Sequence, residues 1–165
     1  SLMAKNKEEK TNVMRVLEQK KIAYTAHTYP HEEGVAVDGV TVAKSMGFDP
    51  AIVFKTLVAR GASKQYYVFD VPVAENLDLK KAAKAVGEKS IEMIHQKELL
   101  PLTGYVHGGC SPVGMKKLFP TVFHETAENL ETMIVSAGKI GYQVELAPHD
   151  LAALVRAKFA DIIVE

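Results

Sequence analysis

Cysteine, tryptophan and net charge are what this 165-residue sequence has least of: it contains one cysteine, no tryptophan and a formal net charge of zero. A single cysteine excludes an intramolecular disulfide framework and cysteine-rich zinc modules, and it is consistent with a reducing compartment. Because 20 basic residues balance 20 acidic ones, the sequence lacks the cationic field that drives non-specific DNA binding. We therefore expect no DNA partner, and contact with other nucleic acids only through a local basic patch.

Long apolar runs are missing as well. No stretch approaches the roughly 20 apolar residues that a membrane-spanning helix needs, and the first seven residues have no apolar core of the signal-peptide kind. We therefore expect no membrane partner and a cytoplasmic location. Ser1-Leu2 ahead of Met3 is typical of an expression scar. We treat residues 1–10 as scar and N-terminal extension, and residues 11–165 as a single domain.

The rest of the composition is that of a globular protein, with 47% hydrophobic and 24% charged residues. Apolar periodicity and turn residues predict helices over 13–21, 40–46, 96–100 and 148–155, with another that is capped by Asn76 or Asp78 and ends at Val86. Predicted strands cover 22–28, 52–60, 65–72, 91–93, 104–107, 121–124, 132–136, 142–146 and 159–164. This uneven spacing favours an α+β fold: a mixed, mostly antiparallel sheet forming a partly closed barrel with flanking helices.

Lys55 is the most unusual residue in this pattern. In the run Val53-Phe54-Lys55-Thr56-Leu57, the alternation of a strand places Lys55 on one face with Val53 and Leu57. An inward ammonium among apolar neighbours could hold an anion or a carbonyl oxygen, with a depressed pKa. The alternative is a lysine on an edge strand whose charged end reaches water.

Two glycine-rich turns are candidates for a ligand site: Gly108 to Gly114, and Ser136 to Gly141. Glycines allow the backbone to approach a ligand closely, and successive N–H groups can hold an anion. Neither turn matches a Walker loop or a dinucleotide fingerprint, and both could be ordinary turns. Together with a lysine in mid-strand they favour a small-ligand pocket.

Neither a protein nucleophile nor a metal site is evident. Cys110 lies in the first glycine-rich turn, where backbone dipoles could lower the pKa of its thiol, but a buried core residue is an equal alternative. Ser111 does not fit the G-x-S-x-G elbow. His27 and His31 are four positions apart with a Tyr-Pro pair between them, which argues against a shared helical face. We expect no metal and no cofactor.

These segments together resemble the YbaK/EbsC family of bacterial aminoacyl-tRNA deacylases, which are similar to the editing domain inserted in bacterial prolyl-tRNA synthetases. The resemblance runs from about Thr11 to Ile163. It rests on motifs at residues 27–29, 53–57, 77–84, 103–106, 108–114, 116–117, 135–139 and 146–151.

The resemblance implies a hydrolase that cleaves the ester between a mischarged amino acid and a tRNA 3′ end, most closely Cys-tRNA(Pro). It also implies that the substrate's own thiol attacks the carbonyl, so that no protein nucleophile is needed. Lys55, with backbone amides around Gly108 and Gly109, would stabilise the oxyanion. The substrate-binding residues that it implies are Tyr29, Thr56, Cys110, Ser111, Pro112, Gly114, Ser136 and Gly138.

Three departures from the family pattern concern specificity: Ala137 replaces a frequent glycine, Cys110 an aliphatic residue, and Gln143 an acid present in some members. Two other functions stay open: an Ala- or Ser-tRNA deacylase that uses a bound water, and a non-catalytic binding or regulatory protein. Lysine clusters at 80–89, 116–117 and 139 are either solvated faces or contacts to RNA phosphates. Zero net charge predicts weak tRNA binding that a partner would assist, and prolyl-tRNA synthetase is the candidate partner.

Overall fold

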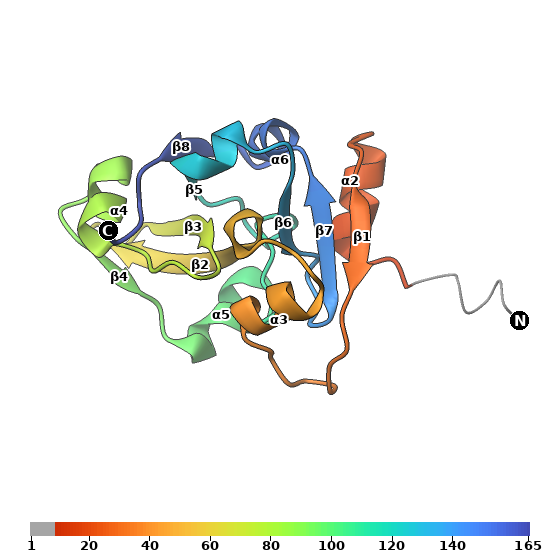
Figure 1. Cartoon of the computed structure of the whole chain (residues 1–165). Helices are drawn as coiled ribbons and strands as arrows, with labels where there is room; N and C mark the ends of the chain where they lie inside the picture. Colours follow the sequence, from red (N-terminus) through yellow and green to blue (C-terminus); the bar gives the residue numbers. More distant parts are fainter. Residues whose placement is uncertain (1–8) are drawn as a thin grey trace, which may run out of the picture.

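The computed structural model describes residues 9–165 (Figure 1); the predicted scar and most of the predicted extension lie outside the described residues. The helices are α2 (Asn12–Gln19), α3 (Gly39–Ser45), α4 (Leu79–Val86), α5 (Gln96–Thr103) and α6 (Pro148–Val155), with 3-10 turns η1 (Pro50–Ile52) and η2 (Glu125–Asn129). The strands are β1 (Thr25–Thr28), β2 (Phe54–Gly61), β3 (Tyr66–Pro72), β4 (Ile91–Met93), β5 (Thr121–His124), β6 (Met133–Ser136), β7 (Tyr142–Leu146) and β8 (Lys158–Ala160). None of these helices is long and apolar enough to cross a membrane.

Two sheets form the centre of the molecule. One has the order β1-β7-β6 and is antiparallel throughout, and the other has the order β4-β2-β3-β5-β8. In the second sheet β4, β2 and β3 are antiparallel, whereas β5 and β8 continue it in parallel. The predicted α+β class and mostly antiparallel pairing are confirmed. Both strand orders are open and a parallel bridge between Val53 and Ile134 links the sheets, so the partly closed barrel is not confirmed.

Local capping explains where several helices begin and end. The Thr11 side chain accepts from the Met14 amide at 3.3 Å and starts α2. Asp78 accepts from the amides of the first turn of α4, and Gly87 ends that helix at φ 73°. Side-chain acceptors at the N-cap and glycine just beyond the last turn satisfy backbone groups that the helix leaves unpaired. The predicted positions of these two helices are confirmed to within about two residues.

Two sequence predictions around Pro101 are wrong. The helix was expected to end at Pro101, but α5 continues to Thr103, whose hydroxyl donates to the Leu99 carbonyl at 2.7 Å. Gly104 ends it instead, at φ 87°, with its amide donating to Leu100. The strand predicted over 104–107 is irregular chain, because the left-handed glycine turns the backbone away from a ladder.

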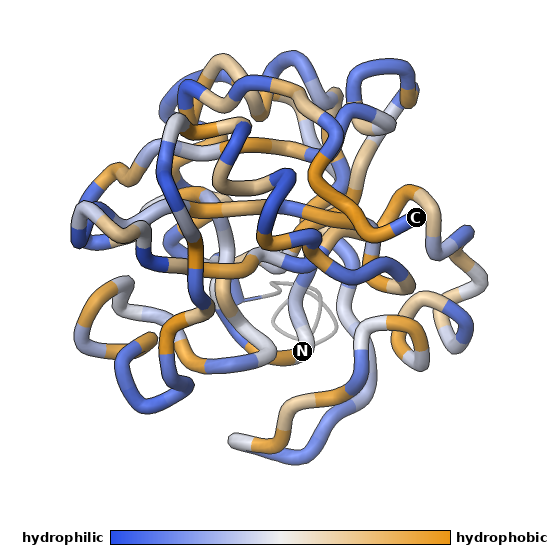
Figure 2. The backbone as a smooth tube through the Cα atoms, turned by 90° about the vertical axis from the view of Figure 1, so that its left-hand side faces the viewer, coloured by the Kyte–Doolittle hydropathy of each residue, from blue (hydrophilic) through white to orange (hydrophobic). Residues whose placement is uncertain are grey.

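Apolar side chains form three clusters. The largest packs α2 and α6 against both sheets around Leu17, Phe123 and Leu151, and a second lies beneath α4. Figure 2 shows the apolar segments concentrated in the interior strands and the polar ones mostly in outer loops. The third cluster, Ala43, Val53, Val73 and Ile134, packs α3 over the bridge between the sheets. It fixes the position of α3 beside the start of β2, where the candidate site lies.

Candidate functional site

A cavity of about 570 Å³ lies beside the first half of β2. This volume is within the range of roughly 300–1,000 Å³ that is typical of small-molecule sites. The walls come from segments distant in sequence, and the lining residues are Tyr29, Ala36, Val37, Asp38, Gly39, Val42, Val53, Phe54, Lys55, Thr56, Leu57, Val73, Leu99, His107, Gly108, Cys110, Ser136, Tyr142 and Gln143. The fold therefore brings the first strand motif and both glycine-rich turns to one cavity.

The Lys55 side chain lines this cavity and is half-buried. Burial lowers the pKa of its ammonium, and the negative charges of Asp38 and Glu75 oppose that shift. Within residues 9–165 it forms no ion pair. Lys55 also lies outside the stretch of β2 that pairs with β4, residues 59–61. An ammonium that is partly desolvated and has no ion-pair partner among the described residues is well suited to bind an oxygen of a ligand.

A buried acid lies directly behind the cavity wall. Thr56 and Asp70 face each other across β2 and β3, and the Thr56 hydroxyl donates to Asp70 Oδ1 at 2.5 Å. Asp70 is fully buried, and this burial raises the pKa of its carboxyl to about 7 despite the hydrogen bond from Thr56, which lowers it. Asp70 Oδ2 has no hydrogen-bond partner among the described residues. Because the Thr56 hydroxyl donates its proton to Asp70, behind the cavity wall, its oxygen can accept a hydrogen bond from a ligand in the cavity.

Cys110 lines the cavity but has the properties of a core residue. It is 8% exposed, and burial, reinforced by the charge of Asp70, raises the pKa of its thiol to about 12. The thiolate is the nucleophilic form of cysteine, and at neutral pH this residue holds its proton. The geometry thus favours the core interpretation over a lowered pKa and a nucleophile.

The two glycine-rich turns pack directly on one another. A Cβ on Gly109 would lie 3.1 Å from the Ile140 nitrogen, a tight contact that the absence of a side chain on glycine avoids. The Gly109 amide donates to the Val106 carbonyl at 3.0 Å, which occupies the N–H that was expected to serve the oxyanion. Gly108 has φ 86° and a Cβ there would lie 2.7 Å from Ala36 Cβ. Its contact with residue 36 brings the loop before α3 over the cavity.

The Tyr105 side chain packs against two further glycines, Gly114 and Gly138. Its hydroxyl donates to the Val113 carbonyl, and a Cβ on Gly114 or on Gly138 would lie 2.9 Å from the Tyr105 side chain. These glycines have φ values of 78° and 91°. They shape the turns that wall the cavity without lining it themselves.

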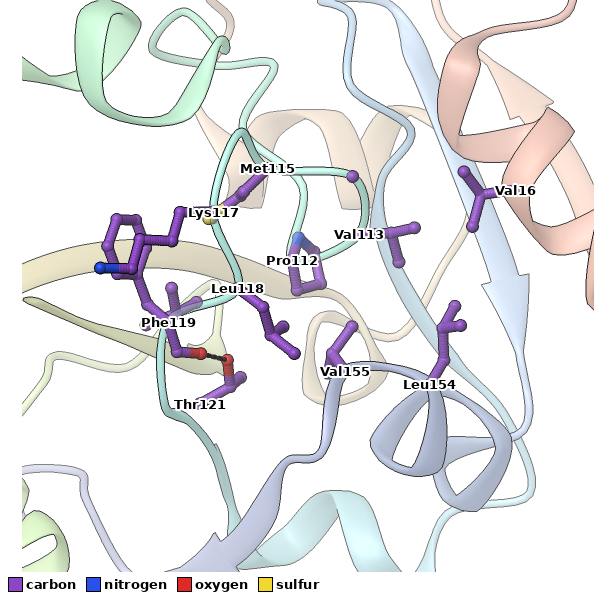
Figure 3. A pocket seen from close by; sticks show the side chains of 12 residues that line it. Val16, Pro112, Val113, Met115, Lys117, Leu118, Phe119, Thr121, Leu154 and Val155 are labelled. Carbon is purple, nitrogen blue, oxygen red and sulfur yellow. Dashed lines mark hydrogen bonds between the residues drawn. The ribbon is translucent and has the colours of Figure 1, made fainter.

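Of the site residues predicted from sequence, the structure brings six to the cavity: Tyr29, Lys55, Thr56, Gly108, Cys110 and Ser136. Five others lie outside its lining: Gly109, Ser111, Pro112, Gly114 and Gly138. Pro112 and Gly114 instead line a smaller cavity of about 130 Å³ (Figure 3). Apolar side chains predominate there, Lys117 extends past the Phe119 ring, and the Thr121 hydroxyl donates to the Phe119 carbonyl. This second cavity offers packing rather than chemistry.

Sequence reasoning missed Asp38, Asp70 and His107, and it noted Gln143 only as a departure. Gln143 is 7% exposed, and its Oε1 has no partner within the described chain. Asp38 caps α3 through Thr41. The signal for Asp70 was available: an acid within the apolar run Tyr66–Pro72 is the same kind of anomaly as Lys55.

The fold and the site together define an α+β protein with a small-ligand cavity, a half-buried lysine on its wall and a buried cysteine that is not poised to act as a nucleophile. Residues 34–154 match the family described as "Aminoacyl-tRNA editing domain". The chain belongs to this family, whose members are aminoacyl-tRNA deacylases, hydrolases that act on ester bonds. The resemblance and the enzyme class predicted from sequence are thereby confirmed.

Individual relatives agree with this assignment. The chain is 46% identical over 161 residues, 97% of its own length and 98% of the relative's, to the Enterococcus faecalis (strain ATCC 700802 / V583) protein named "Putative Cys-tRNA(Pro)/Cys-tRNA(Cys) deacylase EbsC". A solved structure described as "a putative trans-editing enzyme for prolyl tRNA synthetase" is similar with a TM-score of 0.78 and 25% identity, covering 93% of this chain and 95% of that one. The structure of hypothetical protein APE2540, at 18% identity, a TM-score of 0.81 and coverage of 92% and 99%, shares the fold.

Proposed function

We propose that this protein is a trans-editing deacylase that removes cysteine from mischarged tRNA, with Cys-tRNA(Pro) as its substrate. The observation that carries the proposal is the half-buried Lys55 ammonium, which forms no ion pair with the described residues, in a cavity whose one cysteine is held as a thiol. Such a site stabilises developing charge but supplies no thiolate of its own. The 46% identical relative carries the same substrate in its name.

In the proposed reaction the side-chain thiol of the bound cysteinyl group attacks its own ester carbonyl carbon. A sulfur–carbon bond forms while the ester carbon–oxygen bond breaks, and the thiol proton passes to the leaving ribose oxygen. The products are a cyclic thioester and free tRNA, and water later opens the thioester. Lys55 donates to the carbonyl oxygen as negative charge develops on it, and the cavity walls hold thiol and carbonyl in reacting geometry.

We propose that the protein binds the tRNA only through its 3′ end. The net charge of zero supports weak capture of free tRNA, so we propose that prolyl-tRNA synthetase delivers the mischarged product. We also propose a cytoplasmic location, because charged tRNA is made and used there.

Replacement of the Lys55 ammonium tests the function. Cys-, Ser- and Ala-tRNA(Pro) are incubated with wild type, Lys55→Ala and the control Lys44→Ala, and loss of the radiolabelled ester is followed. Lys44 is an exposed lysine in the last turn of α3 and does not line the cavity. We expect Lys55→Ala to lower kcat/KM on Cys-tRNA(Pro) by roughly 10²–10³-fold, the usual effect of losing one oxyanion donor, and Lys44→Ala to match wild type.

The same panel separates the possible mechanisms. Thiol-assisted cleavage predicts turnover of the Cys ester and none of the Ser or Ala ester. Turnover of Ser- or Ala-tRNA at a comparable rate would show that water is the nucleophile and reject the thiol mechanism. Wild-type activity in Lys55→Ala would reject the site itself.

A further inference from the structure

Two side chains of opposite charge lie on the cavity wall. Among the described residues that line it, Lys55 is the one ammonium and Asp38 the one carboxylate. Asp38 is close enough for its charge to raise the pKa of Lys55 against the effect of burial. The two nevertheless form no ion pair in this part of the chain. Each charge is therefore available to a ligand placed between them.

Asp38 is held firmly by one of its two carboxylate oxygens. Oδ2 accepts from both the amide and the hydroxyl of Thr41, each at 3.1 Å, and so caps α3. Oδ1 accepts no hydrogen bond from the described residues. The cap fixes where the carboxylate stands, and its second oxygen keeps the capacity to bind a cation.

The group that the proposed function places in the cavity has matching charges. An α-aminoacyl ester carries an ammonium on the carbon next to its carbonyl, and the carbonyl oxygen becomes negative during cleavage. An ester bound in the cavity needs an anion for the first group and a cation for the second, in close proximity. Asp38 and Lys55 are such a pair.

We infer that Asp38 binds the α-ammonium of the aminoacyl group and thereby makes the site selective for esters of unblocked amino acids. The inference rests on the proposed function. A charge-assisted hydrogen bond between a carboxylate and an ammonium is one of the stronger polar contacts in proteins. An N-acylated ester, such as the one in peptidyl-tRNA, has no positive charge to offer, so it leaves the carboxylate unpaired and is disfavoured.

The test is a cycle of two substrates and two proteins. The substrates are Cys-tRNA(Pro) and 3-mercaptopropionyl-tRNA(Pro), which keeps the thiol and the ester but lacks the amine. The proteins are wild type and Asp38→Asn, because asparagine caps helices as well as aspartate but carries no charge. Asp38→Ser, a second neutral cap, guards against an effect peculiar to asparagine. Asp49→Asn is the matched control, since Asp49 caps η1, is exposed and does not line the cavity.

The amine also changes the intrinsic reactivity of the ester, so the measured quantity is the ratio of variant to wild type on each substrate. We expect Asp38→Asn and Asp38→Ser to lower kcat/KM on the cysteinyl ester by about 10- to 100-fold and to leave the mercaptopropionyl ester unchanged. Asp49→Asn should match wild type on both. Thermal unfolding of each variant confirms that it is folded.

Equal losses on both esters, or no loss on either, would overturn the assignment of Asp38 while leaving the deacylase function intact. Failure of wild type to cleave either ester would overturn the proposed function and this inference with it. A loss confined to the substrate that carries the amine supports both.

Discussion

Asp70 provides a quantitative test of the electrostatics behind the cavity. Its carboxyl is fully buried, and burial raises the pKa from 3.8 to about 7. Among the described residues, the bond that opposes this shift is the 2.5 Å hydrogen bond from Thr56. Each pKa unit corresponds to about 1.4 kcal/mol, so a difference of about 3 between the unfolded and the folded chain corresponds to about 4 kcal/mol.

The sign follows from proton linkage. The folded chain holds the Asp70 proton more tightly than the unfolded chain, so this contribution to stability is complete below about pH 4. It is lost as the pH rises towards about 7, because the unfolded carboxyl then ionises freely while the folded one resists. Asp70→Asn cannot ionise and lacks this contribution. The free energy of unfolding of the variant minus that of wild type should therefore increase with pH, by at most about 1.4 kcal/mol per pH unit.

The measurement is urea unfolding followed by circular dichroism at intervals from about pH 4.5 to about pH 8.5. Taking the difference between variant and wild type cancels the other titrating groups. Asp150→Asn, at an exposed position in α6, is the control variant. A flat difference for Asp70→Asn would mean that the Asp70 carboxyl titrates alike in both states, and the reasoning from its burial would be refuted.

Two further variants test the walls of the cavity. Gly108→Ala places a methyl group 2.7 Å from Ala36 Cβ at a positive φ. We expect it to lose about 1–3 kcal/mol of stability and most deacylase activity. Gly47→Ala, at φ +73° with open space around it, should lose stability alone. Full activity in Gly108→Ala would argue against a functional need for the close contact between residues 108 and 36. Cys110→Ala should keep its deacylation rate within about threefold, because a thiol with a pKa near 12 is not a nucleophile. A hundredfold loss in that assay would reveal a protein nucleophile.

Local signals in the sequence predicted most of the secondary structure. Thr11, Asp78 and Gly87 start or end helices in the structure as capping residues do, and Pro148 begins α6. Such signals act over a few residues and need no tertiary contact. Pro101 is the exception, since the residues around it carry α5 onward to a glycine that the sequence analysis had assigned to a strand.

The candidate site was predictable only where a residue contradicted its surroundings. Lys55 in an apolar strand did so and lies on the cavity wall. Asp38 did not, because an acid before a helix is ordinary capping chemistry, and its place in the cavity depends on a loop that closes through Ala36 and Gly108. Likewise the spacing of glycines cannot tell a ligand-holding turn from one that packs on another turn. Gly109 was assigned to the first kind and its backbone contact with Ile140 is of the second.

The residues that line the cavity come from two kinds of structure, a paired strand and surface loops. Lys55 and Thr56 come from a strand paired along its length with β3, whereas other parts of the lining come from the loops before α3 and after α5. Loops tolerate substitution better than paired strands. Under the proposed function, a lineage could therefore exchange one target amino acid for another by changing loop residues, while Lys55 and Thr56 on the strand stay as they are.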